Sequence, residues 1–307
     1  MAIRVAVQAD PQDRAGWLDL ARTVEDAGFA GLLVGDHPGS GMAPFVALAA
    51  AAAVTERIEL GTYVLNAGVW EPLPLASEVA TLDHVSGGRA VLGVGAGHTP
   101  SEWTTTGREH PPARERVDRM VELVDATQAL LGGDPVTHHG PHFTLVDAHL
   151  ARPPVVRERV PLTVGGAGDR VLRFAAGRAD VVGLTGLGRT LADGHSHEVD
   201  WSPEAIRRTI DTVRTAAREA DRGVALEALV QHVEVTDEAE AAAERLAGGV
   251  TGATAEDLVA APFVWIGTVA EIREQLARWR DELGLERYVV RAPAVDPVTD
   301  ILHERDL

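Results

Sequence analysis

The sequence predicts an α/β fold, a (β/α)8 or TIM barrel with insertion loops, formed by one domain over residues 1–307. Short apolar runs rich in β-branched residues alternate along the whole chain with longer segments in which apolar residues recur every three or four positions. This alternation is typical of a parallel sheet whose strands are connected by helices. Eight such strand segments in 307 residues fit the barrel without a second domain.

The predicted strands cover residues 3–8, 31–35, 58–65, 90–95, 162–165, 180–184, 226–235 and 288–291. Amphipathic helices are predicted between them, most clearly at residues 14–27, 112–131, 203–220 and 269–283. Gly28, Gly87 and Gly284 directly follow predicted helices. Because glycine adopts the left-handed conformation readily, we expect these three residues to be helix C-caps.

Two connections, residues 132–160 and 185–202, are too long to be simple turns. In a barrel such insertions form loops, often near the active face. Residues 137–145 alternate in polarity around Gly140 and Pro141, which predicts a small β-hairpin within the first insertion.

Composition and charge exclude several classes of function. The chain has 28 basic against 46 acidic residues, a net charge of −18, so we expect no nucleic-acid partner. It has no cysteine, which excludes disulfides, thiol nucleophiles and thiolate metal sites. The longest apolar stretch, residues 44–54, is shorter than the roughly 20 residues that a bilayer requires. We therefore expect a cytoplasmic protein with a small-molecule substrate and no membrane partner.

Polar residues follow the predicted second and fourth strands. Asp36 and His37 come at the carboxyl end of the second strand, where barrels carry their chemistry; the pair is either catalytic or a cap of the turn. Glycines alternate in residues 93–97, so that a ligand or another backbone can approach one face closely. His98 stands where a dinucleotide-binding fingerprint needs its third glycine, which argues against a Rossmann fold.

The fifth strand leads into a glycine-rich turn, residues 165–170, followed by a helix. Backbone amides at such a helix N-terminus bind phosphate, and the alternative is an ordinary strand-to-helix turn.

Two further sets of side chains leave alternatives open. Histidines in the insertions either bind a metal or are solvated, and since none has the spacing of a zinc protease we expect no metal; they are His138, His139, His142, His195 and His197. Trp70, Trp103 and Trp201 either form the wall of a site for a flat ligand or fill the core.

Several motifs, taken in order, resemble the bacterial luciferase-like monooxygenase superfamily, and more narrowly its deazaflavin-dependent branch. They are GDH at 35–37, LGTYV at 60–64, ATLDHVSGGR at 80–89, GVGAG at 93–97 and LTVGG at 162–166. The resemblance extends from the first strand to FVWIGT at 263–268 and the last helix. Relatives of this kind bind either FMN or coenzyme F-420, an 8-hydroxy-5-deazaflavin.

The resemblance implies an isoalloxazine-type ring at the carboxyl-terminal mouth of the barrel. Asp36 and His37 would lie beside the ring, and a non-prolyl cis peptide, which falls at Tyr63–Val64 here, would press on its back. The remaining implied contacts are Gly95, Ala96 and Gly97 at the ring edge, and Gly165 and Gly166 around the phosphate.

The chain departs from the sugar-phosphate dehydrogenases of this branch at two places. They carry a glutamate acid after the fourth-strand glycines, where this chain has His98. They also carry a tryptophan shortly after the Asp–His pair, where this chain has Gly39, Ser40 and Gly41. We therefore expect a substrate other than a sugar phosphate.

The resemblance favours an oxidoreductase that transfers a hydride between C5 of coenzyme F-420 and an alcohol, or an activated C=C or C=O group. His37 would be the acid or base, Asp36 would orient it or contact the ring, and His98 would share proton transfer or hold substrate. Alternatives are an FMN-dependent monooxygenase using reduced flavin and O2, a hydrolase with a histidine metal site, and a non-catalytic flavin-binding relative. Family members commonly assemble, so we expect a homodimer or larger homo-oligomer.

Overall fold

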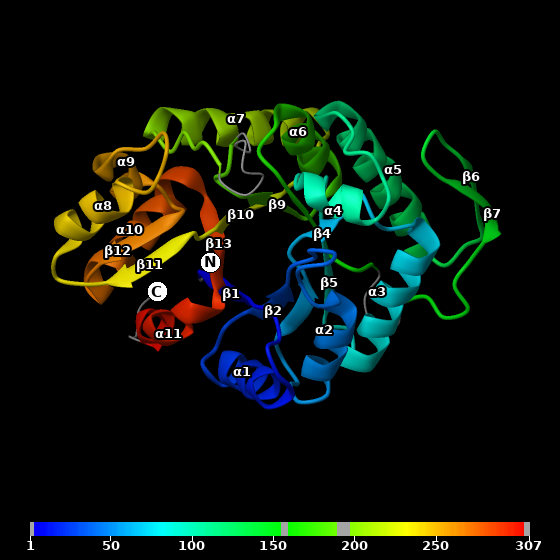
Figure 1. Cartoon of the computed structure of the whole chain (residues 1–307), viewed down its shortest axis with the longest axis horizontal. Helices are drawn as coiled ribbons and strands as arrows, with labels where there is room; N and C mark the ends of the chain where they lie inside the picture. Colours follow the sequence, from blue (N-terminus) through cyan, green and yellow to red (C-terminus); the bar gives the residue numbers. More distant parts are fainter. Residues whose placement is uncertain (1–2, 155–158, 189–196, 304–307) are drawn as a thin grey trace. The chain divides into compact units, whose positions relative to one another are not determined.

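Among the residues that the computed structural model describes, parallel strands alternate with helices along the chain, as a (β/α)8 barrel requires (Figure 1). The structure describes residues 3–154, 159–188 and 197–303. The chain forms two compact units: unit 1 is Met1–Gln8, Asp26–Ala30 and Gly165–Leu307, and unit 2 is Ala9–Glu25 and Gly31–Val164. The single domain over residues 1–307 stays a prediction.

In unit 2, four strands pair in parallel in the order β2 (Gly31–Val34), β3 (Glu59–Thr62), β5 (Ala90–Gly95) and β8 (Leu162–Gly165), the last through Leu162 to Val164. A two-residue strand, β4 (Leu65–Asn66), also pairs with β5. The helices of this unit are α1 (Arg14–Asp26, whose last residue lies in unit 1), α2 (Pro44–Ala52), α3 (Pro72–Ser86), α4 (Pro100–Thr105) and α5 (Ala113–Leu131).

In unit 1, four strands pair in parallel in the order β1 (Arg4–Gln8), β13 (Leu285–Arg291), β10 (Ala225–Leu229) and β9 (Val181–Leu184). A separate parallel pair is formed by β11 (His232–Val235) and β12 (Val264–Gly267). The helices are α6 (Asp169–Arg178), α7 (Pro203–Glu219), α8 (Ala239–Ala247), α9 (Ala255–Ala260), α10 (Val269–Leu283), the short η1 (Ala292–Ala294) and α11 (Val295–His303).

The predicted strand at 58–65 is interrupted. β3 ends at Thr62 and β4 begins at Leu65, and the peptide bond between Tyr63 and Val64 is cis, at the position that the resemblance implies. Gly61 and Gly93 let β3 and β5 approach each other, since an added Cβ would lie 2.2 Å from the Val91 carbonyl oxygen and 2.1 Å from that of Thr62. The packing of these strands therefore depends on the absence of a side chain.

The predicted strand at 226–235 is wrong as one element, because its hydrogen-bond partner changes midway. The amide of Val230 donates to Val289 in β13, whereas the amide of Gln231 donates to Phe263, next to β12. The chain therefore leaves β10 and continues as β11 beside β12, a strand that the periodicity did not predict.

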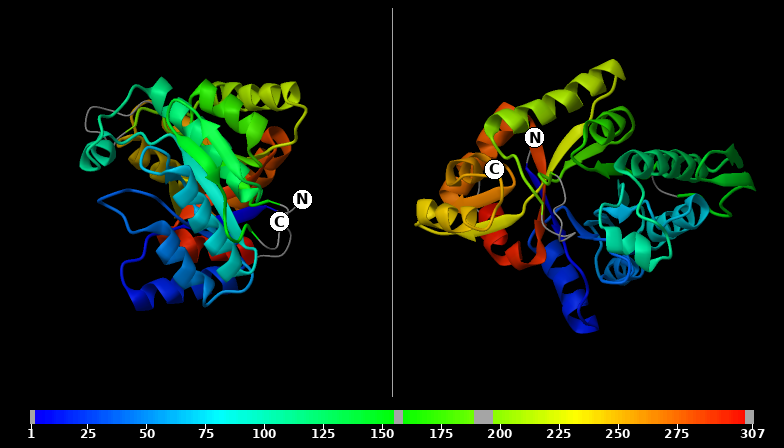
Figure 2. Two further views of the ribbon diagram at one scale, coloured as in Figure 1. Left: turned by 90° about the vertical axis from the view of Figure 1, so that its right-hand side faces the viewer. Right: turned by 45° about the horizontal axis from the view of Figure 1, so that its top comes forward.

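Helix ends and the hairpin follow the predictions. Gly28, Gly87 and Gly284 have φ angles of 81°, 70° and 67°, as left-handed C-caps require. The hairpin forms from β6 (Val136–His139) and β7 (Thr144–Ala148), which pair antiparallel beside α5 (Figures 1 and 2). Among the described residues, no helix combines the length and apolar character needed to cross a membrane.

Candidate active site

The carboxyl ends of β2, β4 and β5 bring an imidazole and a carboxylate together. His37 Nδ1 lies 2.7 Å from Glu102 Oε1, and Glu102 belongs to the first turn of α4. Because a carboxylate oxygen only accepts, His37 carries a hydrogen on Nδ1 and presents Nε2 as its second proton-exchanging atom. The Glu102 side chain is buried, whereas that of His37 is 46% exposed. The pair therefore joins a fixed carboxylate to an accessible acid–base group.

Asn66, the last residue of β4, connects Glu102 to Asp36. Its side-chain Nδ2 donates to Glu102 Oε2 over 2.6 Å, and its backbone amide donates to Asp36 Oδ2 over 3.0 Å. Its Oδ1 accepts from the Gly68 amide over 2.8 Å. Asp36 Oδ2 also accepts from Trp70 Nε1 over 2.9 Å. We call Asp36, His37, Asn66, Trp70 and Glu102 the acid–base network.

The electrostatic setting raises two pKa values in this network. The pKa of His37 is raised chiefly by its hydrogen bond to Glu102, against the effect of burial, and the charges of Glu102, Asp10 and Asp36 add to it. Burial raises the pKa of Asp36, although hydrogen bonds from Asn66 and Trp70 act in the opposite direction. His37 is thus a stronger base than an ordinary histidine, which suits proton transfer near neutral pH.

A cavity of about 520 Å³ adjoins the network. Asp36 and His37 contribute polar groups to its lining, and Met42, Pro44, Val69 and Trp70 contribute apolar surface. The Trp70 ring is held edge-on against Phe45, with ring centroids 5.5 Å apart. A largely apolar wall with a few convergent polar groups, at this volume, is typical of small-molecule sites.

The predicted residues after β5 lie in different surroundings. Gly95 is buried, Ala96 and Gly97 are half-buried, and His98 is exposed. At Gly97, where φ is +70°, an added Cβ would lie 1.9 Å from Asn66 Oδ1, so this glycine makes room for the Asn66 amide. His98 takes the sequence position of the glutamate acid, but Glu102, four residues further on, makes the bond to His37.

Tyr63 and Val64, the predicted backbone contact, are buried and half-buried respectively. In unit 1, the amide of Gly166 donates to the Gly183 carbonyl over 3.2 Å and is therefore engaged with β9. The exposed backbone that follows, residues 167–170, leads into α6, whose N-cap residue Gly168 supplies no side-chain cap. Phosphate binding by Gly165 and Gly166 at this turn stays a prediction.

The tryptophans and histidines for which the sequence left two interpretations lie in different places in the structure. Trp70 lines the cavity, whereas Trp103 and Trp201 are buried, at 2% and 4% exposure. His138 Nε2 bonds to Glu122 Oε1 over 2.9 Å, and His195 lies outside the described residues. Within the described ranges, no group of three or more His, Asp or Glu side chains is arranged to hold a metal ion.

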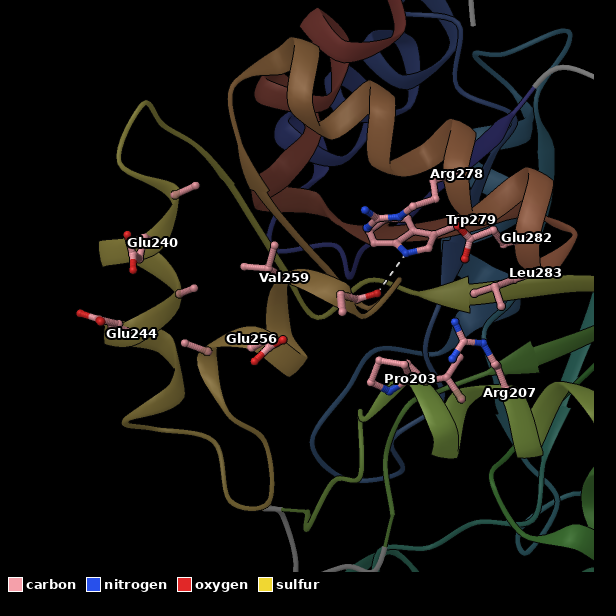
Figure 3. Close-up of a pocket in the computed structure, with 15 residues that line it drawn as sticks. Pro203, Arg207, Glu240, Glu244, Glu256, Val259, Arg278, Trp279, Glu282 and Leu283 are labelled. Carbon is pink, nitrogen blue, oxygen red and sulfur yellow. Dashed lines mark hydrogen bonds between the residues drawn. The ribbon is translucent and has the colours of Figure 1, made fainter.

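A larger cavity, of about 810 Å³, lies in unit 1 between α7, α8, α9 and α10 (Figure 3). The Trp279 indole, fixed by donation to the Ala260 carbonyl over 3.0 Å, forms part of its lining, and charged side chains such as Arg207 and Glu282 surround it. Helices rather than strand ends line this cavity, and it contains no histidine, so the smaller cavity beside His37 is the candidate active site.

Comparison with known proteins identifies the family. The family model of the luciferase-like monooxygenases matches residues 2–253. The chain belongs to this family. It is 33% identical over 236 residues to the 4-hydroxyprotoasukamycin monooxygenase of Streptomyces nodosus subsp. asukaensis, which covers 76% of this chain and 62% of that protein. It is 30% identical over 218 residues to an F420-dependent glucose-6-phosphate dehydrogenase of Amycolatopsis mediterranei, which covers 68% of this chain and 64% of that protein.

The matches to these two proteins cover less than two thirds of their length, at 62% and 64%. A solved structure described as an F420-dependent secondary alcohol dehydrogenase in complex with an F420-acetone adduct superposes over 98% of this chain and 97% of that one. The TM-score is 0.78 at 22% sequence identity. This likeness confirms the (β/α)8 barrel.

The residues that the sequence did not predict are Asn66 and Glu102. Glu102 follows the glycine-rich end of β5, and Asn66 follows the Tyr63–Val64 bond, so both lie close to motifs that carry the resemblance. Glu102 could have been noticed in the sequence as a carboxylate that follows closely after the glycines at the end of β5. Asn66 carries no such signal, because its role depends on contacts with residues 30 and 36 positions away.

Proposed function

We propose that this luciferase-like protein is a coenzyme F-420-dependent oxidoreductase that moves a hydride between the deazaflavin C5 and a small organic substrate, an alcohol or an activated C=C or C=O group. The observation that carries the proposal is the His37–Glu102 pair, 2.7 Å apart, at the cavity beside β2. Two similar proteins named above, one by sequence and one by fold, are described as F420-dependent.

The residues around this cavity fit a deazaflavin. Its volume of about 520 Å³ and its apolar wall of Val69, Pro44 and Trp70 suit a flat tricyclic ring. His37 and Asp36 add an acid–base group and a carboxyl group to the same wall. When bound, the deazaflavin supplies the hydride chemistry.

His37 would handle the proton that accompanies the hydride. Oxidation of an alcohol to a carbonyl removes a hydride from carbon and a proton from the hydroxyl oxygen, so a base must accept that proton. His37 Nε2 accepts it in this direction and donates it in the reverse direction, while Glu102 holds Nδ1–H and stabilises the imidazolium. Asp36 accepts hydrogen bonds from the Asn66 backbone amide and from the Trp70 indole N–H. The second bond keeps Trp70 in the cavity wall.

The substrate class follows from the departures at His98 and at residues 39–41. Since both positions differ from the sugar-phosphate dehydrogenases, we propose a small alcohol or carbonyl compound, the class named in the description of the structural neighbour. A homodimer or larger assembly in the cytoplasm, with neither a nucleic-acid nor a membrane partner, completes the proposal.

The test is a fluorescence titration of the purified protein with oxidised coenzyme F-420 and, separately, with FMN. We expect the deazaflavin to bind at micromolar concentration or below and FMN to bind more weakly. Turnover with a panel of secondary alcohols should then depend on His37, with His37→Ala as the control variant. Preference for FMN would instead favour a monooxygenase, and binding without any turnover would favour a non-catalytic relative.

A further inference from the structure

Two arginines hold the loop that carries Trp70. Arg119 of α5 donates from Nε to the Ala67 carbonyl over 3.1 Å and from Nη2 to the Trp70 carbonyl over 2.9 Å. The same Nη2 lies 3.2 Å from Glu71 Oε1. Arg108 donates to the Gly68 carbonyl between them. Carbonyl groups of a loop lack the partners of a strand or helix, so the guanidinium groups replace those partners.

This loop forms one side of the candidate active site. Val69, Trp70 and Glu71 line the cavity, and the Trp70 indole donates to Asp36. Arg119 itself does not line the cavity, and its side chain is only 12% exposed. A change at Arg119 would therefore reach the cavity through the backbone of the loop.

The hairpin insertion supports Arg119 from the other side. Phe143, at the turn between β6 and β7, is buried, and the Arg119 guanidinium carbon lies 4.3 Å from the centre of its ring. A guanidinium over an aromatic face at this distance is a stabilising cation–π contact. The ring therefore restricts the guanidinium that binds the loop.

The hairpin turn is also bound to α5 through Glu122, which lies about one helical turn after Arg119. The buried Glu122 accepts from the amides of Phe143 and His142 over 2.9 Å and 3.1 Å, and from His138 Nε2 over 2.9 Å. At Gly140 an added Cβ would lie 1.9 Å from Glu122 Oε1, so the turn passes directly over this carboxylate. Phe143 consequently has one defined position relative to Arg119.

We propose that Arg119 and Phe143 are positioning residues, through which the β6–β7 hairpin holds Trp70 and the adjoining loop in the wall of the cavity. The contacts run from Phe143 to Arg119, then to the carbonyls of Ala67 and Trp70, and finally to Asp36. The insertion thereby sets the shape of the ligand site without touching the ligand. Its consequence for catalysis rests on the proposed function.

The first test uses hydrogen–deuterium exchange of the free protein, so it does not depend on which cofactor binds. In Phe143→Ala, we expect amides of residues 66–71 to exchange about tenfold faster than in the wild type. Val146→Ala removes an apolar side chain from the same hairpin, but Val146 is 71% exposed, and this control should leave the exchange unchanged. Equal exchange in all three proteins would overturn the proposal.

Arg119→Lys provides a second variant, which keeps a positive charge at this position of α5 and a cation next to the Phe143 ring. A lysine ammonium cannot bridge two carbonyls with a planar fork, so exchange of residues 66–71 should rise here too. In the loaded enzyme, both variants should weaken cofactor binding about tenfold and leave the pH dependence of turnover unchanged. A shifted pH profile, or exchange that rises across the whole chain, would contradict a positioning role.

Discussion

His37 depends on two side chains that are distant from it in the sequence. Glu102 orients its ring, and Asn66 orients Glu102 while its backbone amide binds Asp36. Asp36 and His37 stand out in the sequence because they follow a predicted strand, and the structure places both in the lining of the cavity, while their roles stay predictions. Glu102 has only its place shortly after the glycines of β5 as a signal, and Asn66 has none, since no local pattern reveals which side chains meet at the strand ends of unit 2. A side chain at a strand end is thus easier to find in a sequence than the side chains that hydrogen-bond to it.

Replacing Glu102 with glutamine should change the pH dependence of activity. The charged acceptor is the main cause of the raised His37 pKa, so that pKa should fall in Glu102→Gln. The limb of the pH–rate profile that reports His37 would move to lower pH, and kcat/KM would fall about a hundredfold. Steady-state kinetics across pH measures both effects. An unmoved limb would separate His37 from the reaction.

The same pair gives a stability effect with a definite sign. A raised pKa in the folded state means that the pair stabilises the protein fully below the ordinary histidine pKa, and that this contribution is lost as pH rises through the raised value. Glu102→Gln should therefore differ most from the wild type in mildly acidic solution.

Gly97 can be tested as a space-making residue. In Gly97→Ala the new Cβ would lie 1.9 Å from Asn66 Oδ1, at a φ of +70° that alanine adopts poorly. We expect a loss of at least about 1–2 kcal/mol in the free energy of unfolding, measured by denaturant titration. Gly223→Ala is a matched control, because a Cβ there meets nothing within 4 Å and φ is not positive. Equal stability of the two variants would contradict this role.

At the scale of elements, periodicity identified most helices and strands but not their partners. Strands β5 and β8 and helix α10 have the predicted bounds, because their apolar patterns end at glycines or at a helix cap. The division of 226–235 into β10 and β11 escaped prediction, since the apolar run continues while the hydrogen-bond partner changes from β13 to the segment beside β12. Pairing is decided by tertiary contacts, which a single sequence does not display.

One carboxylate joins two elements and should govern acid stability. Glu25, in the last turn of α1, accepts from the amides of Arg57, Glu56 and Ile58 over 2.6, 2.9 and 3.2 Å, at the start of β3. Burial acts to raise the pKa of Glu25, but these hydrogen bonds outweigh it and lower the pKa. Its stabilising effect is therefore present above the ordinary glutamate pKa and is lost as pH falls through the depressed value.

Glu25→Gln should lower the free energy of unfolding by about 1–3 kcal/mol at neutral pH and reduce the loss of stability between neutral and acidic pH. Glu56→Gln serves as the control, because its side chain is exposed and only its backbone amide takes part. Urea denaturation at a series of pH values measures the difference. If the free energy of unfolding of wild type and Glu25→Gln changed with pH in the same way, Glu25 would not be responsible for the loss of stability in acid.

For the whole molecule, the order of chain segments predicts how the protein unfolds. The chain passes between units 1 and 2 at residues 8–9, 25–26, 30–31 and 164–165, so neither unit is a continuous piece of sequence. If one unit unfolded alone, its segments would stay tethered at both ends to the other, folded unit. Such tethering restricts the unfolded segments and costs conformational entropy. We therefore expect one cooperative thermal transition, as the single predicted domain requires, with equal calorimetric and van't Hoff enthalpies. Saturation with coenzyme F-420 at about 100 times its Kd should move this transition upward as one, by roughly 4 °C. Two transitions, of which the cofactor moves only one, would show that the units are independent domains and that the site belongs to one of them.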